Sequence, residues 1–400
     1  MRGRVFTKGN KNYIVFDIGK NPTTGKRQQK TMAVPGTKRD AEKKLREVLR
    51  ELDTGSFINP TKITLTAHLE NWLRDYVWPQ LAPRTAEGYE HTVRQHISPS
   101  FLGNIMLTDL KPEHLLRYYA EKAATGRRDG KGGLNLRSVR HHHEILYTAL
   151  DRAVENGLIG LNPAKRVKAP RYQKTEQHYL DANGISRVLE CAKDTHFYAL
   201  YYTALSTGMR RSELLALRWS DVDLTLGQIS VSRSLHHLRT GEMVYRQPKS
   251  AKGSRLIPLP PSLSLELKVH KEAQTDMFLN MGRLLKEDDL TFSRLIKDAK
   301  SMQFITAPLL PDTVTATWAK IVKRAGCPGV RFHDIRHSHA SLLLSQGVHP
   351  KIVQERLGHS SIQITLDTYS HIMPGLQRAA AEGFDVLIKK TPNESIKETR

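Results

Sequence analysis

The N-terminal stretch of the chain first alternates in the manner of a small sheet and then takes up a helical repeat. Residues 11–18 have strand composition, residues 21–26 are rich in turn formers, and residues 28–34 form a candidate returning strand. From Thr37, a candidate N-cap, apolar residues recur on one helical face as far as Asp53. The pattern predicts a three-stranded sheet backed by one helix.

A wholly helical pattern extends from residue 62 to residue 165, after a candidate linker at 55–61. A last helix is expected over 138–156, where Gly157 ends it, and the basic, proline-bearing stretch 162–175 is typical of a linker between domains. The apolar positions on three successive helical faces are Leu65, Leu69, Trp72 and Leu73; Tyr89, Val93 and Ile97; and Leu110, Leu115, Leu116 and Tyr119.

The rest of the chain mixes helices with short alternating segments. The expected helices are 185–189, 197–205 and 212–219, and the expected strands of one small antiparallel sheet are 228–235, 242–246 and 254–258. Helices then continue as far as residue 388. The predicted fold class is therefore multidomain α+β, with a small three-stranded sheet plus a helix, an all-α domain, and a mainly α domain that carries a small antiparallel sheet. The predicted domain boundaries are 1–60, 61–165, 166–178 as a linker, 179–388, and 389–400 as a flexible tail.

The chain carries a large positive charge. Its 400 residues include 62 Lys and Arg against 40 Asp and Glu, which gives a formal net charge of +22. Such an excess indicates a polyanionic partner, because each cation that neutralises a phosphate releases a condensed counterion. Residues 1–60 alone hold 14 Lys and Arg against 6 Asp and Glu, so their sheet could lie in a DNA groove. The alternatives are a merely basic soluble protein and a solvated basic face.

Cysteine and histidine usage argues against a metal centre. Cys191 and Cys327 lie far apart without a C-x-x-C pattern, so neither a disulfide framework nor a cysteine zinc site is expected. His141, His142 and His143 are adjacent on a helix and point in different directions, so they cannot all bind one ion. The chain shows neither a signal peptide nor an apolar run long enough for a bilayer, and we expect a soluble, cytoplasmic protein.

Two arginines are candidates for holding a phosphodiester. Breaking a DNA strand without a metal places negative charge on the nonbridging phosphate oxygens, and a planar guanidinium binds two such oxygens at once. Arg210 and Arg336 each lie beside an expected helix start, where backbone N–H groups reinforce the positive field. Glu213, one turn beyond Arg210, is a candidate for orienting an arginine or a histidine.

The remaining chemistry needs a nucleophile, a base and an acid. Tyr369 is the candidate nucleophile, since a phosphotyrosyl ester would preserve the bond energy for rejoining. His333 or a neighbouring group could accept the phenol proton, and His359 could donate a hydrogen bond to the scissile phosphate. The 5′ oxygen that leaves needs a general acid, for which Lys249 is the candidate and Lys252 the alternate.

With these motifs the chain resembles the tyrosine recombinases, the phage integrase family. The matching phrases are TGMRRSELLALRW at 207–219, FHDIRHSHA at 332–340 and LGHSS at 357–361. The resemblance covers residues 1–388, and it implies an arm-type DNA-binding domain, a helical core-binding domain of the SAM-like type and a catalytic domain. The catalytic set that it implies is Arg210, Lys249, His333, Arg336, His359 and the nucleophile Tyr369, with Glu213 in support.

The resemblance also implies an activity and partners. Four protomers would synapse two DNA sites, exchange strands through 3′-phosphotyrosyl links and a Holliday junction, and need no metal or nucleotide cofactor. The expected partners are double-stranded DNA with core and arm sites, an excisionase and a DNA-bending protein, acting at the bacterial nucleoid. The segment 376–388 would be a terminal helix that docks on a neighbouring protomer or packs on its own domain.

Several other functions are weighed against an integrase of a phage or conjugative element of Gram-positive bacteria. A chromosome or plasmid dimer resolvase usually lacks the extra N-terminal domain, and a type IB topoisomerase relaxes DNA without exchanging partners. A DNA-binding protein that had lost catalysis would lack the tyrosine or an arginine, and both are present here. A metal-dependent nuclease would need a cluster of Asp and Glu that does not accompany these motifs.

Overall fold

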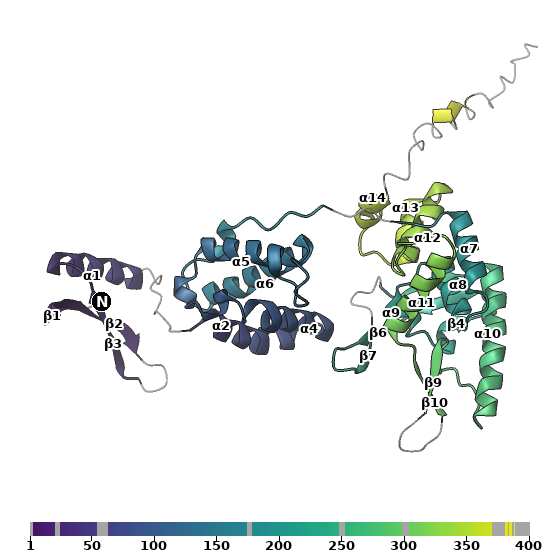
Figure 1. Ribbon diagram of the computed structural model, residues 1–400, viewed down its shortest axis with the longest axis horizontal. Helices are drawn as coiled ribbons and strands as arrows, with labels where there is room; N and C mark the ends of the chain where they lie inside the picture. The colour runs from purple at the N-terminus through teal and green to yellow at the C-terminus, as the bar shows by residue number, and fades with distance from the viewer. Residues whose placement is uncertain are drawn as a thin grey trace, which may run out of the picture. The chain divides into compact units, whose positions relative to one another are not determined.

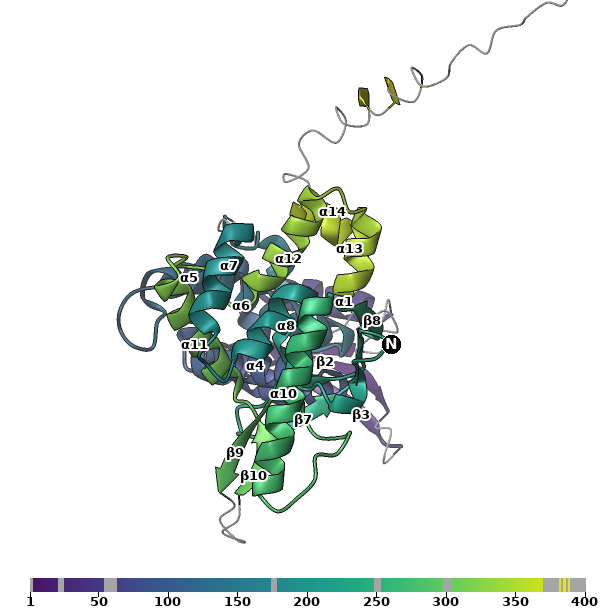
Figure 2. The same cartoon turned by 90° about the vertical axis from the view of Figure 1, so that its right-hand side faces the viewer.

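The computed structural model divides the chain into two compact units, Met1–Lys174 and Thr175–Arg400 (Figures 1 and 2). It describes residues 3–20, 25–53, 63–173, 178–247, 253–297 and 304–369, together with residues 381, 382, 384, 385 and 388. No helix among these residues is long and apolar enough to cross a membrane.

The first unit begins with an antiparallel sheet that one helix covers. The strands β1 (Gly3–Lys8), β2 (Lys11–Lys20) and β3 (Arg27–Val34) lie in that order, and α1 (Lys38–Asp53) packs along one face (Figure 1). The N-cap at Thr37 is confirmed, because its hydroxyl accepts from the Asp40 backbone at 3.4 Å while the Asp40 carboxylate accepts from the Thr37 backbone at 2.8 Å. The core of this part consists of Ile14, Phe16, Ala41 and Val48.

The other part of the first unit is helical, with its own core. Its α-helices are α2 (Leu65–Trp72), α3 (Trp78–Gln80), α4 (Pro83–Thr92), α5 (Pro112–Thr125) and α6 (Leu136–Glu155). Its shorter π and 3-10 turns are η1 (Leu73–Val77), η2 (Val93–Ile97), η3 (Phe101–Asn104), η4 (Leu107–Asp109) and η5 (Pro163–Arg166). The predicted apolar faces form this core, except that Leu116 is exposed, since its neighbour Leu115 takes the inward position.

The three consecutive histidines of α6 have separate partners. The Tyr118 hydroxyl lies 3.0 Å from His142 Nδ1, and the Tyr119 hydroxyl lies 3.0 Å from His143 Nδ1. His141 instead lies 3.7 Å from Glu144 on the exposed side of the helix. Two of the rings therefore serve as buried hydrogen-bond partners between α5 and α6.

The second unit surrounds a larger core with helices. These are α7 (Ala182–Ala192), α8 (Tyr198–Thr207), α9 (Arg211–Leu214), α10 (Pro261–Asn280), α11 (Pro311–Arg324), α12 (Asp334–Ser345), α13 (Pro350–Leu357) and α14 (Ile362–Tyr369), with a 3-10 turn η6 (Trp219–Asp221). The helix α8 is central, because it contacts α7, α9, α10 and α12 (Figure 2). Its Tyr201 hydroxyl donates to the Val314 carbonyl at 2.9 Å and ties it to α11.

Among the described residues of the second unit, the strands form three small antiparallel sheets. The first has the order β4 (Val222–Asp223), β5 (Gln228–Val231) and β8 (Arg255–Pro258). The second pairs β6 (Ser234–His237) with β7 (Met243–Arg246), and the third pairs β9 (Ser293–Lys297) with β10 (Phe304–Pro308). The predicted fold class is confirmed, but the expected single sheet is wrong, because the chain leaves one sheet between Val231 and Ser234 and starts another.

Two further expectations are corrected. The helix expected over 212–219 ends at Leu214, because the backbone beyond it pairs with a later segment. Thr291 N donates to Leu217 O at 2.8 Å, and Trp219 N donates to Asp289 O at 3.1 Å. The hairpin β9–β10 lies where helices were expected to continue, and Ile305 stands opposite Ile296 in its register. The predicted terminal helix, 376–388, lies outside the described residues except at the five positions named above.

Candidate active site

The close approach of three helices begins at Gly208, which ends α8. Its φ of +64° is left-handed, and an added Cβ would lie 2.7 Å from Leu357 Cδ2 and 2.9 Å from His339 Cδ2. A side chain at this position would therefore be strained and would also collide with neighbouring side chains. The glycine lets the end of α8 lie directly against α12 and α13.

Arg210 follows this turn as the N-cap residue of α9. Its backbone N–H donates to Glu213 Oε2 at 2.9 Å, and its Nη1 donates to Glu213 Oε1 at 2.7 Å. Its Nη2 donates to the carbonyl of Gly358 at 3.2 Å. The side chain is 38% exposed, so this guanidinium is held from two sides and still reaches solvent.

Arg336 comes from the first turn of α12 and is far more buried, with 4% of its surface exposed. Its Nη1 donates to the carbonyl of Gly208 at 2.9 Å, and its Nη2 donates to the carbonyl of Leu357. A guanidinium carries five N–H donors, and each of these bonds uses one of them. Arg336 thereby joins the ends of α8 and α13.

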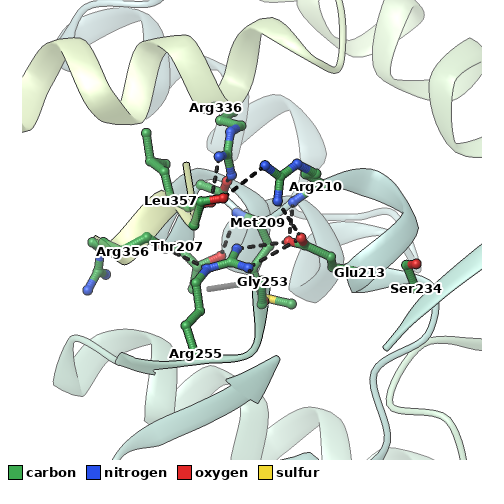
Figure 3. Close-up of polar contacts among 12 residues, drawn as sticks. Thr207, Met209, Arg210, Glu213, Ser234, Gly253, Arg255, Arg336, Arg356 and Leu357 are labelled. Atoms are coloured by element: carbon green, nitrogen blue, oxygen red, sulfur yellow. Dashed lines mark hydrogen bonds and ion pairs between the residues drawn. The ribbon is translucent and has the colours of Figure 1, made fainter. Parts of the chain in front are cut away.

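A third arginine, Arg255 at the start of β8, completes this arrangement. Its Nε donates to the carbonyl of Arg356 at 2.8 Å. The carbonyls of three consecutive residues, 356, 357 and 358, thus each accept a hydrogen bond from an arginine of a different element (Figure 3). These carbonyls lie at the C-terminal end of α13, where a helix presents unpaired acceptors and negative potential, so they are a natural anchor for guanidinium groups.

Glu213 lies between two of these arginines. Arg255 Nη2 donates to its Oε2 at 2.8 Å and Arg255 Nη1 to its Oε1 at 3.3 Å, on the other side from Arg210 (Figure 3). Burial alone would raise the pKa of this carboxyl group, but the hydrogen bonds and charge of Arg255, followed by those of Arg210, bring the pKa below its usual value. Glu213 is therefore a buried carboxylate whose two oxygens accept hydrogen bonds from both Arg210 and Arg255.

His359 contributes a neutral imidazole beside these cations. Burial, followed by the charges of Arg336 and Arg210, lowers the pKa of His359 to about 4. Its Nδ1 lies 2.9 Å from the hydroxyl of Thr365, which is fully buried in α14. If that hydroxyl donates, the proton of the neutral ring is on Nε2, where the ring can donate to another group.

His333 precedes α12, and its ring lies 5.4 Å from that of His337, nearly perpendicular to it. The residue as a whole is exposed, but neighbouring atoms exclude part of the water around its ring. This desolvation, followed by the charge of Arg336, lowers the pKa of His333. Burial also lowers the pKa of His337, to about 4. A neutral imidazole at this position has the lone pair that a proton acceptor needs.

The structure brings together Arg210, Glu213, Arg336 and His359, and it places His333 three residues before Arg336 at the start of the same helix. Tyr369 is the last residue of α14, a helix that contacts α12 and α13, but the position of its side chain lies outside the described residues. Lys249 and Lys252 also lie outside them, between Gln247 and Gly253. The roles of the tyrosine and the lysine stay predictions.

The sequence reasoning missed Arg255, Arg356 and His339. Arg356 Nε donates to His339 Nε2 at 3.0 Å, and the other side of that ring, Nδ1, lies 2.9 Å from the carbonyl of Leu205. Arg356 also donates to the carbonyl of Ser206 at 2.9 Å. These contacts join α8, α12 and α13. The nearest available signal was the place of Arg255 at the start of a predicted strand, just beyond the candidate lysine.

Comparison with known proteins gives the same assignment. Residues 178–374 match the phage integrase family, and residues 64–123 match the phage integrase N-terminal SAM-like domain. A tyrosine recombinase XerC-like protein of Caldanaerobacter subterraneus is 29% identical over 365 residues, which cover 86% of this chain and 89% of the relative. The ICEBs1 integrase of Bacillus subtilis is 28% identical over 390 residues, which cover 94% of this chain and 97% of the relative.

A solved structure has the same fold. The Tn1549 transposon integrase (residues 82–397 of that protein), in complex with a circular intermediate DNA, superposes with a TM-score of 0.63 at 19% identity. The match covers 80% of this chain and 99% of that one. The family match spans every candidate catalytic residue from Arg210 to Tyr369. The chain therefore belongs to the tyrosine recombinase family, also called the phage integrase family, and is a site-specific recombinase that breaks and rejoins DNA strands.

Proposed function

We propose that this recombinase integrates and excises a mobile element, and that it does so through a 3′-phosphotyrosyl intermediate. The observation that carries the proposal is the set of guanidiniums anchored on the end of α13, with the neutral His359 beside Arg210 and Arg336. Fixed positive charge without a metal suits a phosphodiester whose nonbridging oxygens gain charge during attack. The likeness to the ICEBs1 integrase along nearly the whole chain supports a mobile element as the source.

In the cleavage step, the Tyr369 oxygen attacks the scissile phosphorus, and the bond from phosphorus to the 5′ oxygen breaks. His333 accepts the phenol proton, and Lys249, with Lys252 as the alternate, gives a proton to the 5′ oxygen as it leaves. Meanwhile, Arg210 and Arg336 hold the nonbridging oxygens. Rejoining reverses these transfers, with a 5′-hydroxyl of the partner strand as the nucleophile and the tyrosine as the leaving group.

The His359 imidazole has a separate part in this scheme. Because its pKa is about 4, the ring is neutral at physiological pH and does not add a full charge to the site. With Nδ1 occupied by Thr365, its Nε2–H donates to a nonbridging oxygen of the phosphate. This hydrogen bond strengthens as charge develops on that oxygen.

The other parts of the chain would bind the attachment sites. The basic sheet and helix of 3–53 would contact arm sites, and the helical part of the first unit would contact the core site together with the catalytic domain. Double-stranded DNA is the substrate, as in the complex of the Tn1549 integrase, and four protomers would form the synapse. An excisionase and a DNA-bending protein would set the direction of recombination at the bacterial nucleoid.

A suicide substrate tests this function. The probe is a duplex that carries the junction between the element and its host, nicked close to the cleavage position so that the cut fragment diffuses away and the covalent adduct accumulates. Wild-type protein should form a protein–DNA adduct that survives denaturation, and Tyr369→Phe should form none while still binding the duplex. Equal adduct from both proteins would refute the assignment of Tyr369 as the nucleophile.

A further inference from the structure

We propose that Arg255 is a positioning residue for the recombination reaction, which holds Glu213 and, through it, sets the orientation of Arg210 toward the scissile phosphate. The inference rests on the proposed function for its catalytic readout. Arg255 acts from behind the site, since its side chain is 6% exposed and that of Glu213 is 8% exposed. Neither group presents the open surface that contact with DNA would need.

The hydrogen bonds of Arg255 have three different targets. Two go to the Glu213 carboxylate, one from Nε goes to the carbonyl of Arg356, and one from Nη1 goes to the carbonyl of Gly253 at 3.2 Å. A single planar guanidinium therefore connects α9, the end of α13 and the start of β8. Lysine offers three donors on one nitrogen and cannot reproduce this fork.

The turn at Gly358 packs directly against the guanidinium of Arg255. Gly358 has a left-handed φ of +66°, and an added Cβ would lie 3.0 Å from both Cδ and Nη1 of Arg255. The plane of the Arg255 side chain thus occupies the space next to the glycine. The carbonyl of the same glycine accepts from Arg210, so Arg255 and Arg210 both lie against Gly358.

The buried carboxylate explains how Arg255 acts on Arg210. Glu213 is ionised because two guanidiniums share it, and a buried carboxylate that loses one partner is strongly destabilised. Without Arg255, Glu213 either gains a proton or relies on Arg210 alone. In both cases the bidentate contact that fixes the Arg210 backbone and side chain changes its geometry.

Arg255 could affect cleavage through phosphate positioning or through the general acid, and the leaving group of the substrate distinguishes these two routes. Gly253 directly follows the segment 248–252, which contains Lys249, so Arg255 could instead act on the general acid. A substrate with sulfur in place of the bridging 5′ oxygen distinguishes these routes, because a thiolate leaves without being protonated. A defect in phosphate positioning persists on the sulfur substrate, whereas a defect in proton donation is relieved.

The experiment measures single-turnover cleavage of matched oxygen and sulfur suicide substrates by full-length protein. Arg255→Gln should cleave the oxygen substrate roughly 10- to 100-fold more slowly than wild type, by analogy with residues that orient a ligand-binding group. DNA affinity should stay within about twofold, and the same rate ratio should appear on the sulfur substrate. Arg255→Lys should show an intermediate defect. An unchanged rate on oxygen, or full recovery on sulfur, would overturn the proposal.

Arg218→Gln is the matched control, because Arg218 also binds a buried carboxylate three residues later, that of Asp221. Its cleavage rate should equal that of wild type. A second measurement does not need activity: the unfolding free energies of Arg255→Gln, Glu213→Gln and the double variant should be nonadditive, since the residues contact each other. Absence of adduct from wild type would refute the proposed function, and additive unfolding energies would by themselves refute the role of Arg255.

Discussion

The Nδ1 atom of His359 lies 2.9 Å from the hydroxyl of Thr365, a residue with no exposed surface in the helix that ends at Tyr369. This contact ties the residues proposed to bind the phosphate to the helix that carries Tyr369, the proposed nucleophile. When the Thr365 hydroxyl is the donor, the neutral imidazole of His359 carries its proton on Nε2.

Replacing Thr365 by valine should weaken catalysis without unfolding the protein. Valine keeps the shape of threonine but removes the hydroxyl, so His359 loses the partner that orients its ring. We expect single-turnover cleavage to slow by about threefold to tenfold, which corresponds to the ~1 kcal/mol of one hydrogen bond. Thr365→Ser keeps the hydroxyl and should cleave near the wild-type rate. Equal rates for valine and serine would show that the contact does not orient His359.

Removing the Arg210 guanidinium should affect the chemical step far more than DNA binding. Arg210→Ala should cost roughly 3 kcal/mol in the cleavage step, a loss typical of one preorganised donor to a developing oxyanion. The rate is measured with excess enzyme on a suicide substrate, and affinity by titration at fixed salt. Arg283→Ala is the control, because Arg283 binds the carboxylate of Asp289 instead. Loss of DNA affinity in a folded Arg210→Ala protein would contradict the assigned role.

Gly208→Ala should destabilise the second unit through both backbone strain and collision. A left-handed φ costs a non-glycine residue about 1–3 kcal/mol, and the added methyl group also meets Leu357 and His339. Gly326 has a similar φ of +71° with no neighbour within 4 Å of an added Cβ. Chemical denaturation of the two alanine variants therefore separates the two costs. Equal losses of unfolding free energy would show that the neighbours move aside.

Acid should weaken the second unit through His339. Burial, followed by the charge of Arg356, lowers the pKa of His339 to about 4 in the folded protein, below the value near 6.5 of an unfolded histidine. Between pH 6.5 and pH 4, His339 is therefore protonated more in the unfolded chain than in the folded protein. The stability that comes from this difference is complete above pH 6.5 and is lost as the pH falls toward 4. The contribution is on the order of 3 kcal/mol, because each pKa unit between 6.5 and about 4 is worth about 1.4 kcal/mol.

The unfolding transition of the second unit is measured by chemical denaturation at several pH values. The unfolding free energy of wild type should fall between pH 6.5 and pH 4, and His339→Asn should reduce the slope, because asparagine cannot be protonated there. The same slope in both proteins would assign the acid sensitivity to other groups. His337 and His359, with pKa values of about 4, contribute in the same direction.

Periodicity predicted the parts of the fold in which burial alone decides the pattern. Leu65, Leu69 and Val93 are buried as the helical repeat indicated. The prediction was wrong where tertiary pairing replaces local preference. Leu217, inside an expected helix, accepts from Thr291, and the strands 293–297 and 304–308 take their conformation from each other. Such pairings depend on residues distant in sequence, which a local repeat does not contain.

The site was predicted in part for a similar reason. Arg210, Glu213, Arg336 and His359 stand in short motifs whose residue types suit a phosphodiester, and the structure places them together. Arg255 has no such motif. It is one arginine in a chain with 62 Lys and Arg, and its four hydrogen bonds are made only after β8, α9 and α13 have packed.

Arg210, Arg255 and Arg336 each donate to one of three consecutive carbonyls, so one short segment of backbone supports three guanidiniums. All three guanidiniums depend on the last turn of α13, although they come from segments far apart in the chain. A rotation of that turn would therefore disturb one hydrogen bond of each of the three guanidiniums at once. The end of α13 is therefore a shared anchor for three arginines that come from different segments of the chain.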